Sequence, residues 1–127
     1  MTSSAISTFL TEFSCAIDSS GVSGEDKVSF FAQEKLSDYG VEAHLIKDES
    51  RPTTLKKRYR AQDQTLLRVS HLHHDSIDNN LQKLMLQKIE KIISDCSLLV
   101  FSDFNYGSLP QTLVDELITR VSRPDLI

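Results

Sequence analysis

Cationic side chains alternate along one short stretch of the chain, and this stretch holds the residues best suited to bind an anion. From Arg51 to Ser70 it reads RPTTLKKRYRAQDQTLLRVS. In an extended strand, three of its cationic side chains point to one side: Lys56, Arg58 and Arg60. Arginine binds phosphate through two parallel hydrogen bonds, whereas lysine binds it as a point charge. The alternation therefore predicts a cationic face that suits a small anionic ligand.

The same stretch has the pattern of a two-stranded ribbon. Residues 53–60 read as one strand, 61–64 as a polar hairpin loop and 65–69 as a second strand that carries Arg68. Such a ribbon is marginally stable alone and needs a third strand, a helix layer or another chain to cover its apolar side. On pattern alone, an ordinary solvated hairpin remains the alternative.

Length and charge limit the kinds of partner. A chain of 127 residues is the size of one domain with one hydrophobic core. Its net charge of −4 and pI near 5.5 argue against a nucleic-acid-binding surface, because the cations gather in one stretch and acids dominate elsewhere. No apolar run has membrane-spanning length and no secretory leader is recognisable, so we expect no membrane partner and a cytoplasmic location.

Helices and strands must position this ribbon. The periodicity of apolar residues predicts a short helix near residues 6–13, a break at 18–21, a helix over 25–39 and a half-buried strand over 41–46. After the ribbon, a helix capped by Asp75 or Ser76 carries an apolar stripe from Ile77 to Ile93, and another helix follows Pro110.

One apolar run, Leu98 to Phe101, is typical of a central parallel strand covered on both faces. It ends in polar residues that include Asp103 and Asn105, with Gly107 in the turn. In open α/β sheets, ligands bind beyond the carboxyl ends of the strands. We therefore expect an α/β layered fold with a small β excursion, and a site where this strand ends.

Two further groups suggest chemistry but lack a defining pattern. His71, His73, His74 and Asp75 lie close in sequence, yet no HExxH or CxxC spacing accompanies them, so we expect a solvated loop and no metal site. Cys15 and Cys96 are expected to be separate buried thiols.

Two motifs resemble a known family. PTTLKKRYRAQDQTLLRVS and LLVFSDFNYGSLP are similar to segments of the ribokinase-like (PfkB-type) carbohydrate kinases, which read PTTxKxRxxxxxQxLLRxD and LSDYxKGxL. The resemblance is greatest to the heptose-7-phosphate kinase domain of the ADP-heptose synthases. Upstream, Gly21 to Asp26 resembles the family's GxxGxDxxG turn. Together the matches cover the central portion of such a kinase, from Phe13 to Val121.

This resemblance implies a partial ribokinase-like α/β/α sandwich in which residues 1–127 form a single domain and residues 41–70 form a β-sheet lid. The complete family enzyme would use ATP and Mg²⁺ to phosphorylate a carbohydrate hydroxyl, with the lid closing over the sugar and excluding water. The residues implied to bind a phosphosugar are the following: Lys56, Arg58, Gln64, Arg68, Asp103 and Asn105.

The departures from the family pattern affect catalysis. Ser29 replaces the last glycine of the GxxGxDxxG turn, and Tyr106 replaces the lysine of SDYxKG. The chain holds neither the GGxxxN sugar motif nor the GxGD motif that carries the family's catalytic base, so we assign no catalytic residue here.

Three interpretations remain open. The chain is an excerpt of a longer sugar kinase, as in a fusion to a nucleotidyltransferase. Alternatively, it is an inert relative that binds a sugar phosphate or a protein partner. The third interpretation is an interaction module, since lid ribbons of this family can pair between subunits into a homodimer.

Overall fold

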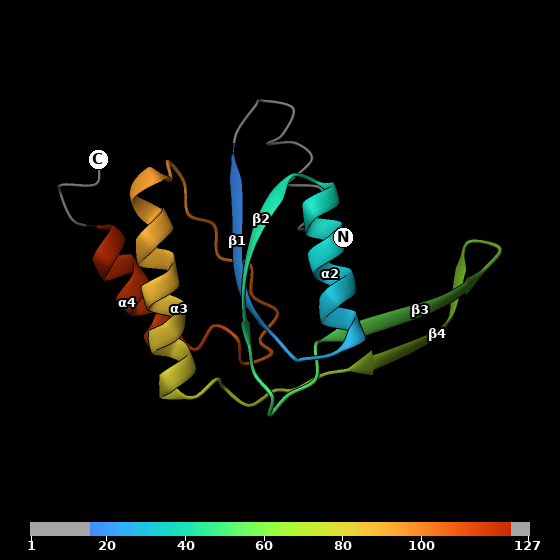
Figure 1. The fold of residues 1–127 in the computed structure, drawn as a ribbon. Coiled ribbons are helices and arrows are strands. Elements are labelled where there is room, and N and C mark those ends of the chain that lie inside the picture. Colours follow the sequence, from blue (N-terminus) through green and yellow to red (C-terminus); the bar gives the residue numbers. More distant parts are fainter. Residues whose placement is uncertain (1–15, 123–127) are drawn as a thin grey trace.

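The computed structural model describes residues 16–122, which form a mixed α/β fold with two small sheets (Figure 1). The elements run in this order: β1 (Ile17–Ser23), α2 (Lys27–Asp38), β2 (Val41–Lys47), β3 (Leu55–Ala61), β4 (Gln64–His71), α3 (Asn79–Ile92), the 3₁₀ turn η1 (Ile93–Asp95) and α4 (Gln111–Val121). None of the helices in this range has the length and apolarity needed to cross a membrane.

The first half is a parallel βαβ unit. β1 and β2 pair in parallel from Ile17 opposite Val41 to Ser23 opposite Lys47, and α2 connects them. Asp26 begins α2 by accepting a hydrogen bond from the backbone N–H of Ser29. Gly40 has a φ of 68°, which allows the chain to leave the helix and enter β2 at once. The helix and the strand predicted over 25–46 are therefore confirmed.

The hydrophobic core lies on the other face of the β1–β2 pair, under α3 and α4. Its buried members come from β2, the segment before α3, and both helices: Ile46, Ile77, Met85, Leu86, Ile89, Leu113 and Leu117. Asp78 caps α3, because its carboxylate accepts the N–H of Leu81. This corrects the predicted cap at Asp75 or Ser76, which lie before the chain turns into the helix.

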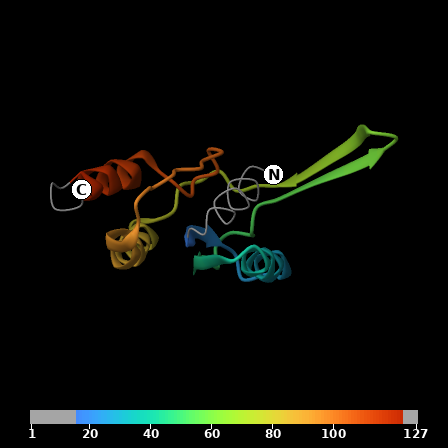
Figure 2. The ribbon, with the colours of Figure 1, turned by 90° about the horizontal axis from the view of Figure 1, so that it is seen from above.

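β3 and β4 form a separate antiparallel hairpin that extends away from the helices (Figures 1 and 2). The predicted four-residue loop is a two-residue turn, in which Gln62 and Asp63 have φ values of 46° and 63°. Positive φ at both positions is typical of a type I′ turn, whose twist matches that of the two strands. The predicted ribbon is thus confirmed: β4 is longer than the predicted strand over 65–69, whereas β3 begins two residues later than predicted.

The central strand predicted at Leu98 to Phe101 is wrong for this structure. These residues form no strand, and the side chains of Leu98 and Val100 are 71% and 55% exposed. An apolar run gains stability as a strand only when neighbours pair with its backbone and cover its faces. No described strand pairs with this segment, so it runs as an irregular connection between η1 and α4.

The structure corrects two smaller predictions. Residues 18–21 do not break the chain but lie within β1, because the ladder with β2 satisfies their backbone despite their polar side chains. Cys96 is exposed, not buried. The predicted helix at 6–13 and Cys15 lie outside the described residues.

Candidate functional site

The cationic face predicted for the hairpin is present. Because directly paired residues of an antiparallel ladder share a face, the pairing of Arg58 with Arg68 and of Lys56 with Ser70 places three cations on one side. A pocket of about 200 Å³ lies against this face. Its lining residues come from the hairpin, the chain after it and the segment before α4: Lys56, Arg58, Arg68, Ser70, Leu72 and Tyr106.

Aromatic side chains from the segment before α4 hold one of these cations. The Lys56 ammonium lies 4.6 Å from the ring centre of Tyr106 and 5.2 Å from that of Phe104. The two rings are nearly parallel, with an interplanar angle of 17°, and His74 meets Tyr106 edge-on at 5.6 Å. A cation above an aromatic face is attracted by the ring's quadrupole. These contacts join the hairpin to the segment that follows the predicted strand.

Residues of the GxxGxD and PTT motifs interlock at the base of the hairpin. The carboxylate of Asp26 accepts the backbone N–H of Thr53 at 2.8 Å, and the hydroxyl of Thr53 accepts the N–H of Gly24 at 2.9 Å. The backbone hydrogen bonds from Thr53 and then Ser29 lower the pKa of Asp26 below 3.8. A Cβ at Gly24 would lie 2.6 Å from the carbonyl oxygen of Arg51. Both motifs therefore anchor the strand that enters the hairpin.

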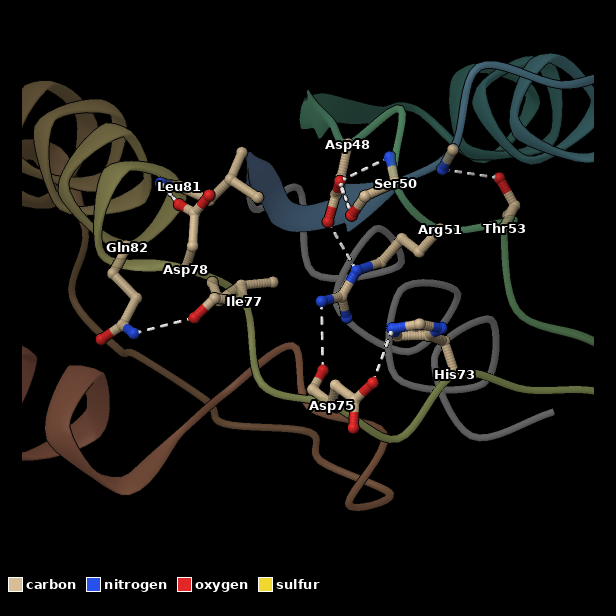
Figure 3. A network of polar contacts seen from close by, with 11 residues as sticks. Asp48, Ser50, Arg51, Thr53, His73, Asp75, Ile77, Asp78, Leu81 and Gln82 are labelled. Atoms are coloured by element: carbon tan, nitrogen blue, oxygen red, sulfur yellow. Dashed lines mark hydrogen bonds and ion pairs between the residues drawn. The ribbon is translucent and has the colours of Figure 1, made fainter.

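A buried ion pair supports the same base (Figure 3). Arg51 Nε donates to Asp48 Oδ2 at 2.6 Å, and the two side chains are 7% and 6% exposed. Burial alone would raise the pKa of Asp48, but hydrogen bonds from Ser50 and the ion pair with Arg51 bring it below 3.8. Arg51 Nη2 also donates to the carbonyl oxygen of Asp75 at 3.1 Å. Arg51 thus ties the chain entering the hairpin to the chain leaving it.

The turn at Gly107 completes this framework. Its φ of 75° and its close approach to the backbone of Asp75 leave no room for a side chain. The N–H of Ile77 donates to the Gly107 carbonyl at 2.9 Å. Because Tyr106 precedes this glycine, the turn fixes where its ring meets the hairpin. The turn therefore requires a glycine at the position that matches the glycine of the SDYxKG motif.

The structure brings only some of the predicted site residues together in one pocket. Lys56, Arg58 and Arg68 line one pocket, whereas Gln64 lies beside the hairpin turn. Asp103 and Asn105 are exposed and absent from the lining, and the Asp103 carboxylate accepts the N–H of Asn105 at 3.0 Å. A sugar-binding role for these three residues remains a prediction.

Three lining residues were missed by sequence reasoning. Ser70, Leu72 and Tyr106 line the pocket beside the cations. The sequence did mark Tyr106, because it replaces the lysine of the family's SDYxKG motif. The alternation of the ribbon, however, gave no indication that Lys56 would contact it. Nothing marked Leu72, because it lies among the histidines and outside the strand pattern.

The lining composition determines what the pocket can do chemically. It contains three cations and no carboxylate, so it attracts an anion and offers no carboxylate ligand for Mg²⁺. It also contains no residue suited to remove a proton from a hydroxyl at neutral pH. In the nearby histidine loop, His73 Nε2 lies 3.4 Å from Asp75 Oδ2. The geometry thus favours anion binding over catalysis by these residues.

Comparisons with known proteins confirm the resemblance seen in the motifs. Curated relatives carry the name Bifunctional protein HldE. The chain is 30% identical to that of Nitratiruptor sp. over 115 residues, which is 91% of this chain and 25% of the relative. It is 32% identical over 99 residues to that of Helicobacter hepaticus, covering 77% of this chain and 20% of the relative. For Ectopseudomonas mendocina the identity is 33% over 89 residues, or 70% and 18%. No protein-family model matches the chain.

Proposed function

We propose that this chain is the lid-bearing part of a phosphosugar kinase domain. The proposal rests on its relation to one part of the bifunctional HldE proteins. The chain spans about a quarter of the length of the Nitratiruptor relative. In the complete domain, ATP would donate its γ-phosphate to a carbohydrate hydroxyl. The proposed contribution of this chain is to bind and enclose the sugar phosphate. A kinase that draws on ATP fits a cytoplasmic location, which we propose as well.

The cationic pocket is the observation that carries this proposal. Arg58 and Arg68 face the same side of the hairpin and line the pocket with Lys56. Two guanidinium groups and an ammonium suit the phosphate that a phosphosugar already carries. Leu72 and the Tyr106 ring add apolar surface next to these charges, which a sugar ring can cover. A free inorganic anion would use only the cations.

The projection of the hairpin supports the proposed lid role. It projects from its base and extends away from the helices (Figures 1 and 2). The ties at Asp26, Arg51 and Gly107 fix that base to the rest of the fold. A projecting hairpin on a rigid base can close over a ligand and exclude water from the transferred group.

ATP and Mg²⁺ would supply the phosphoryl group and neutralise its charge. The pocket lining holds no carboxylate for a metal ion, and the chain has no GxGD sequence. The residues that line this pocket therefore do not fit a nucleotide–magnesium site, and we assign them no step of the transfer. Their proposed task is to bind the phosphosugar and to shield it from water.

A matched pair of variants tests phosphosugar binding. Arg68→Gln removes a charge from the pocket, whereas Lys57→Gln removes one from the opposite face of the same hairpin, because Lys57 pairs with Val69. Isothermal titration of the full chain with heptose 7-phosphate and with the unphosphorylated heptose should show binding of the phosphorylated sugar only. We expect Arg68→Gln to weaken it by about tenfold or more, since a charge-assisted hydrogen bond contributes about 1.5–3 kcal/mol. Equal losses of affinity in both variants would show that binding depends only on the overall charge of the hairpin. This result would refute the proposed site.

We further propose that two copies pair through the face of the hairpin that lies opposite the cations. This face carries Tyr59 and Leu67, which pair in register and are 52% and 55% exposed. Exposed apolar side chains on a two-stranded ribbon gain stability when another chain covers them. A second copy is the proposed partner, because the same surface is then buried twice in one symmetric contact.

A further inference from the structure

One histidine and two carboxylates converge on the β1–β2 pair, away from the hairpin. Asp18 is paired with Glu42 in the parallel ladder, and His44 follows two residues later on the same face. His44 Nε2 lies 2.8 Å from an oxygen of Asp18 and 3.8 Å from one of Glu42. The ligand atoms of all three side chains lie within 4.8 Å of one another. This register gives the cluster a fixed backbone frame.

The separations suit one shared metal ion. Zinc bonds to nitrogen and oxygen are about 2.1 Å long, so two ligand atoms of a tetrahedral zinc lie about 3.4 Å apart. The two distances from His44 fall on either side of this value, and adjustments of about half an ångström would equalise them. The Glu42 side chain is 76% exposed, so it can make this adjustment freely. The side chains of Asp18 and His44 are 25% and 21% exposed and are held more firmly.

A neighbouring hydroxyl independently supports a site at this place. Ser20 pairs with His44 in the ladder and therefore shares the face of the cluster. Its Oγ atom is buried and has no hydrogen-bond partner among residues 16–122. Buried hydroxyl groups in native proteins nearly always have a partner, and a water molecule bound to an ion can provide one.

We propose that Asp18, Glu42 and His44 bind a divalent transition-metal ion, with Zn²⁺ the best match. One imidazole and two carboxylates are the donors that such ions accept, and the two negative charges balance the charge of the ion. The fourth position would hold water, next to the Ser20 hydroxyl. The Cys96 thiol is not counted as a ligand, because it is not among the side chains whose ligand atoms lie within 4.8 Å of one another.

The proposed role is structural. Asp18 and Glu42 lie near the start of β1 and β2, and the hairpin joins the molecule beyond the ends of these strands, about 16 Å further along. A metal here cannot take part in chemistry at the cationic pocket. It would instead add a further link between two strands that already pair through their backbone ladder and through the contact between His44 and Asp18. This site therefore does not depend on the proposed kinase function.

Zinc titration of the full chain tests the site. We expect one equivalent of Zn²⁺ to bind in isothermal titration at pH 7 and to raise the thermal midpoint, because a ligand that binds only the folded state stabilises it. Co²⁺ should bind at the same site and give visible absorption of a four- or five-coordinate centre. His44→Ala and Glu42→Gln should each weaken Zn²⁺ binding by about tenfold or more. Glu42→Gln is the variant least able to disturb folding, since this side chain is mostly exposed.

Two control variants separate this site from the other metal-binding side chains. His73→Ala removes a histidine of the loop after the hairpin, and Cys96→Ser removes the exposed thiol. Both should bind Zn²⁺ as the parent chain does. The proposal is overturned if Zn²⁺ fails to bind in a saturable way, if Glu42→Gln and folded His44→Ala leave the affinity unchanged, or if a control variant abolishes binding.

Discussion

Replacing Tyr106 tests how the pocket holds its lysine. The Lys56 ammonium lies closer to the Tyr106 ring centre, at 4.6 Å, than to that of Phe104, at 5.2 Å. A cation–π contact contributes about 0.5–1 kcal/mol at an exposed site and about 2 kcal/mol when desolvated. Tyr106→Leu removes the nearer ring, whereas Tyr106→Phe keeps the ring and loses only the hydroxyl. We therefore expect the leucine variant to release Lys56 and the phenylalanine variant to retain it.

Binding and spectroscopy give two readouts of this change. Lys56 is expected to contribute to phosphate binding only while the ring holds it in place. Loss of a cation–π energy of about 1 kcal/mol in Tyr106→Leu should therefore weaken heptose 7-phosphate binding by about fivefold. Tyr106→Phe should bind within about twofold of the parent chain. In NMR spectra, the ε-methylene protons of Lys56 should be shifted upfield by the rings in the parent and in Tyr106→Phe, but less so in Tyr106→Leu. Tighter binding by Tyr106→Leu would refute this reasoning, because it would show that the ring withholds the lysine from the ligand.

Four further outcomes are expected. Arg51→Met should lower the free energy of unfolding in urea by about 3 kcal/mol, because Asp48 is left buried without its partner; a loss below 1 kcal/mol would contradict this role. Stability should fall as the pH drops from about 3.8 toward the lower folded-state pKa values, because Asp26 and Asp48 have pKa values lowered by folding; in acid titrations followed by circular dichroism, Asp26→Asn should show less of this fall. Val100→Asp should change stability by no more than about 0.5 kcal/mol, since that side chain is 55% exposed, and unfolding of the variant would restore the strand predicted there. Leu67→Lys should shift the sedimentation coefficient from dimer to monomer, and a monomeric parent chain would disprove the proposed pairing.

The sequence was sufficient where a local pattern determines the structure. The alternation of Lys56 and Arg58 predicted the cationic face, and antiparallel pairing then brought Arg68 to the same side. Helix α2 was equally predictable, because its apolar spacing, the Asp26 cap and Gly40 all agree. Each of these features depends on neighbours in sequence or on one short hairpin.

The errors arose where distant partners decide the outcome. Residues 18–21 look like a break because they are polar and include Gly21, yet pairing with β2 makes them a strand. The apolar run that contains Val100 looks like a buried strand, yet no described strand pairs with it. Which segments pair is a property of the whole fold, and single-sequence periodicity does not contain it.

The interlock of the motifs could not be read from the sequence either. Asp26 and Thr53 match separate motifs of the resembling family, and the structure shows that they bond to each other. Tyr106 also gained its meaning only from the contact with Lys56. These long-range contacts are what unite the motifs into one candidate site.

Chemical-shift mapping tests the central claim most directly, namely that the cationic face of the hairpin binds a sugar phosphate. Titrating the isotopically labelled full chain with heptose 7-phosphate should shift the signals of Arg58, Arg68 and Tyr106 in a saturable way. The signal of Lys57, on the opposite face, should move little. Saturable shifts confined to other parts of the chain, or no shifts at all, would contradict the proposed site.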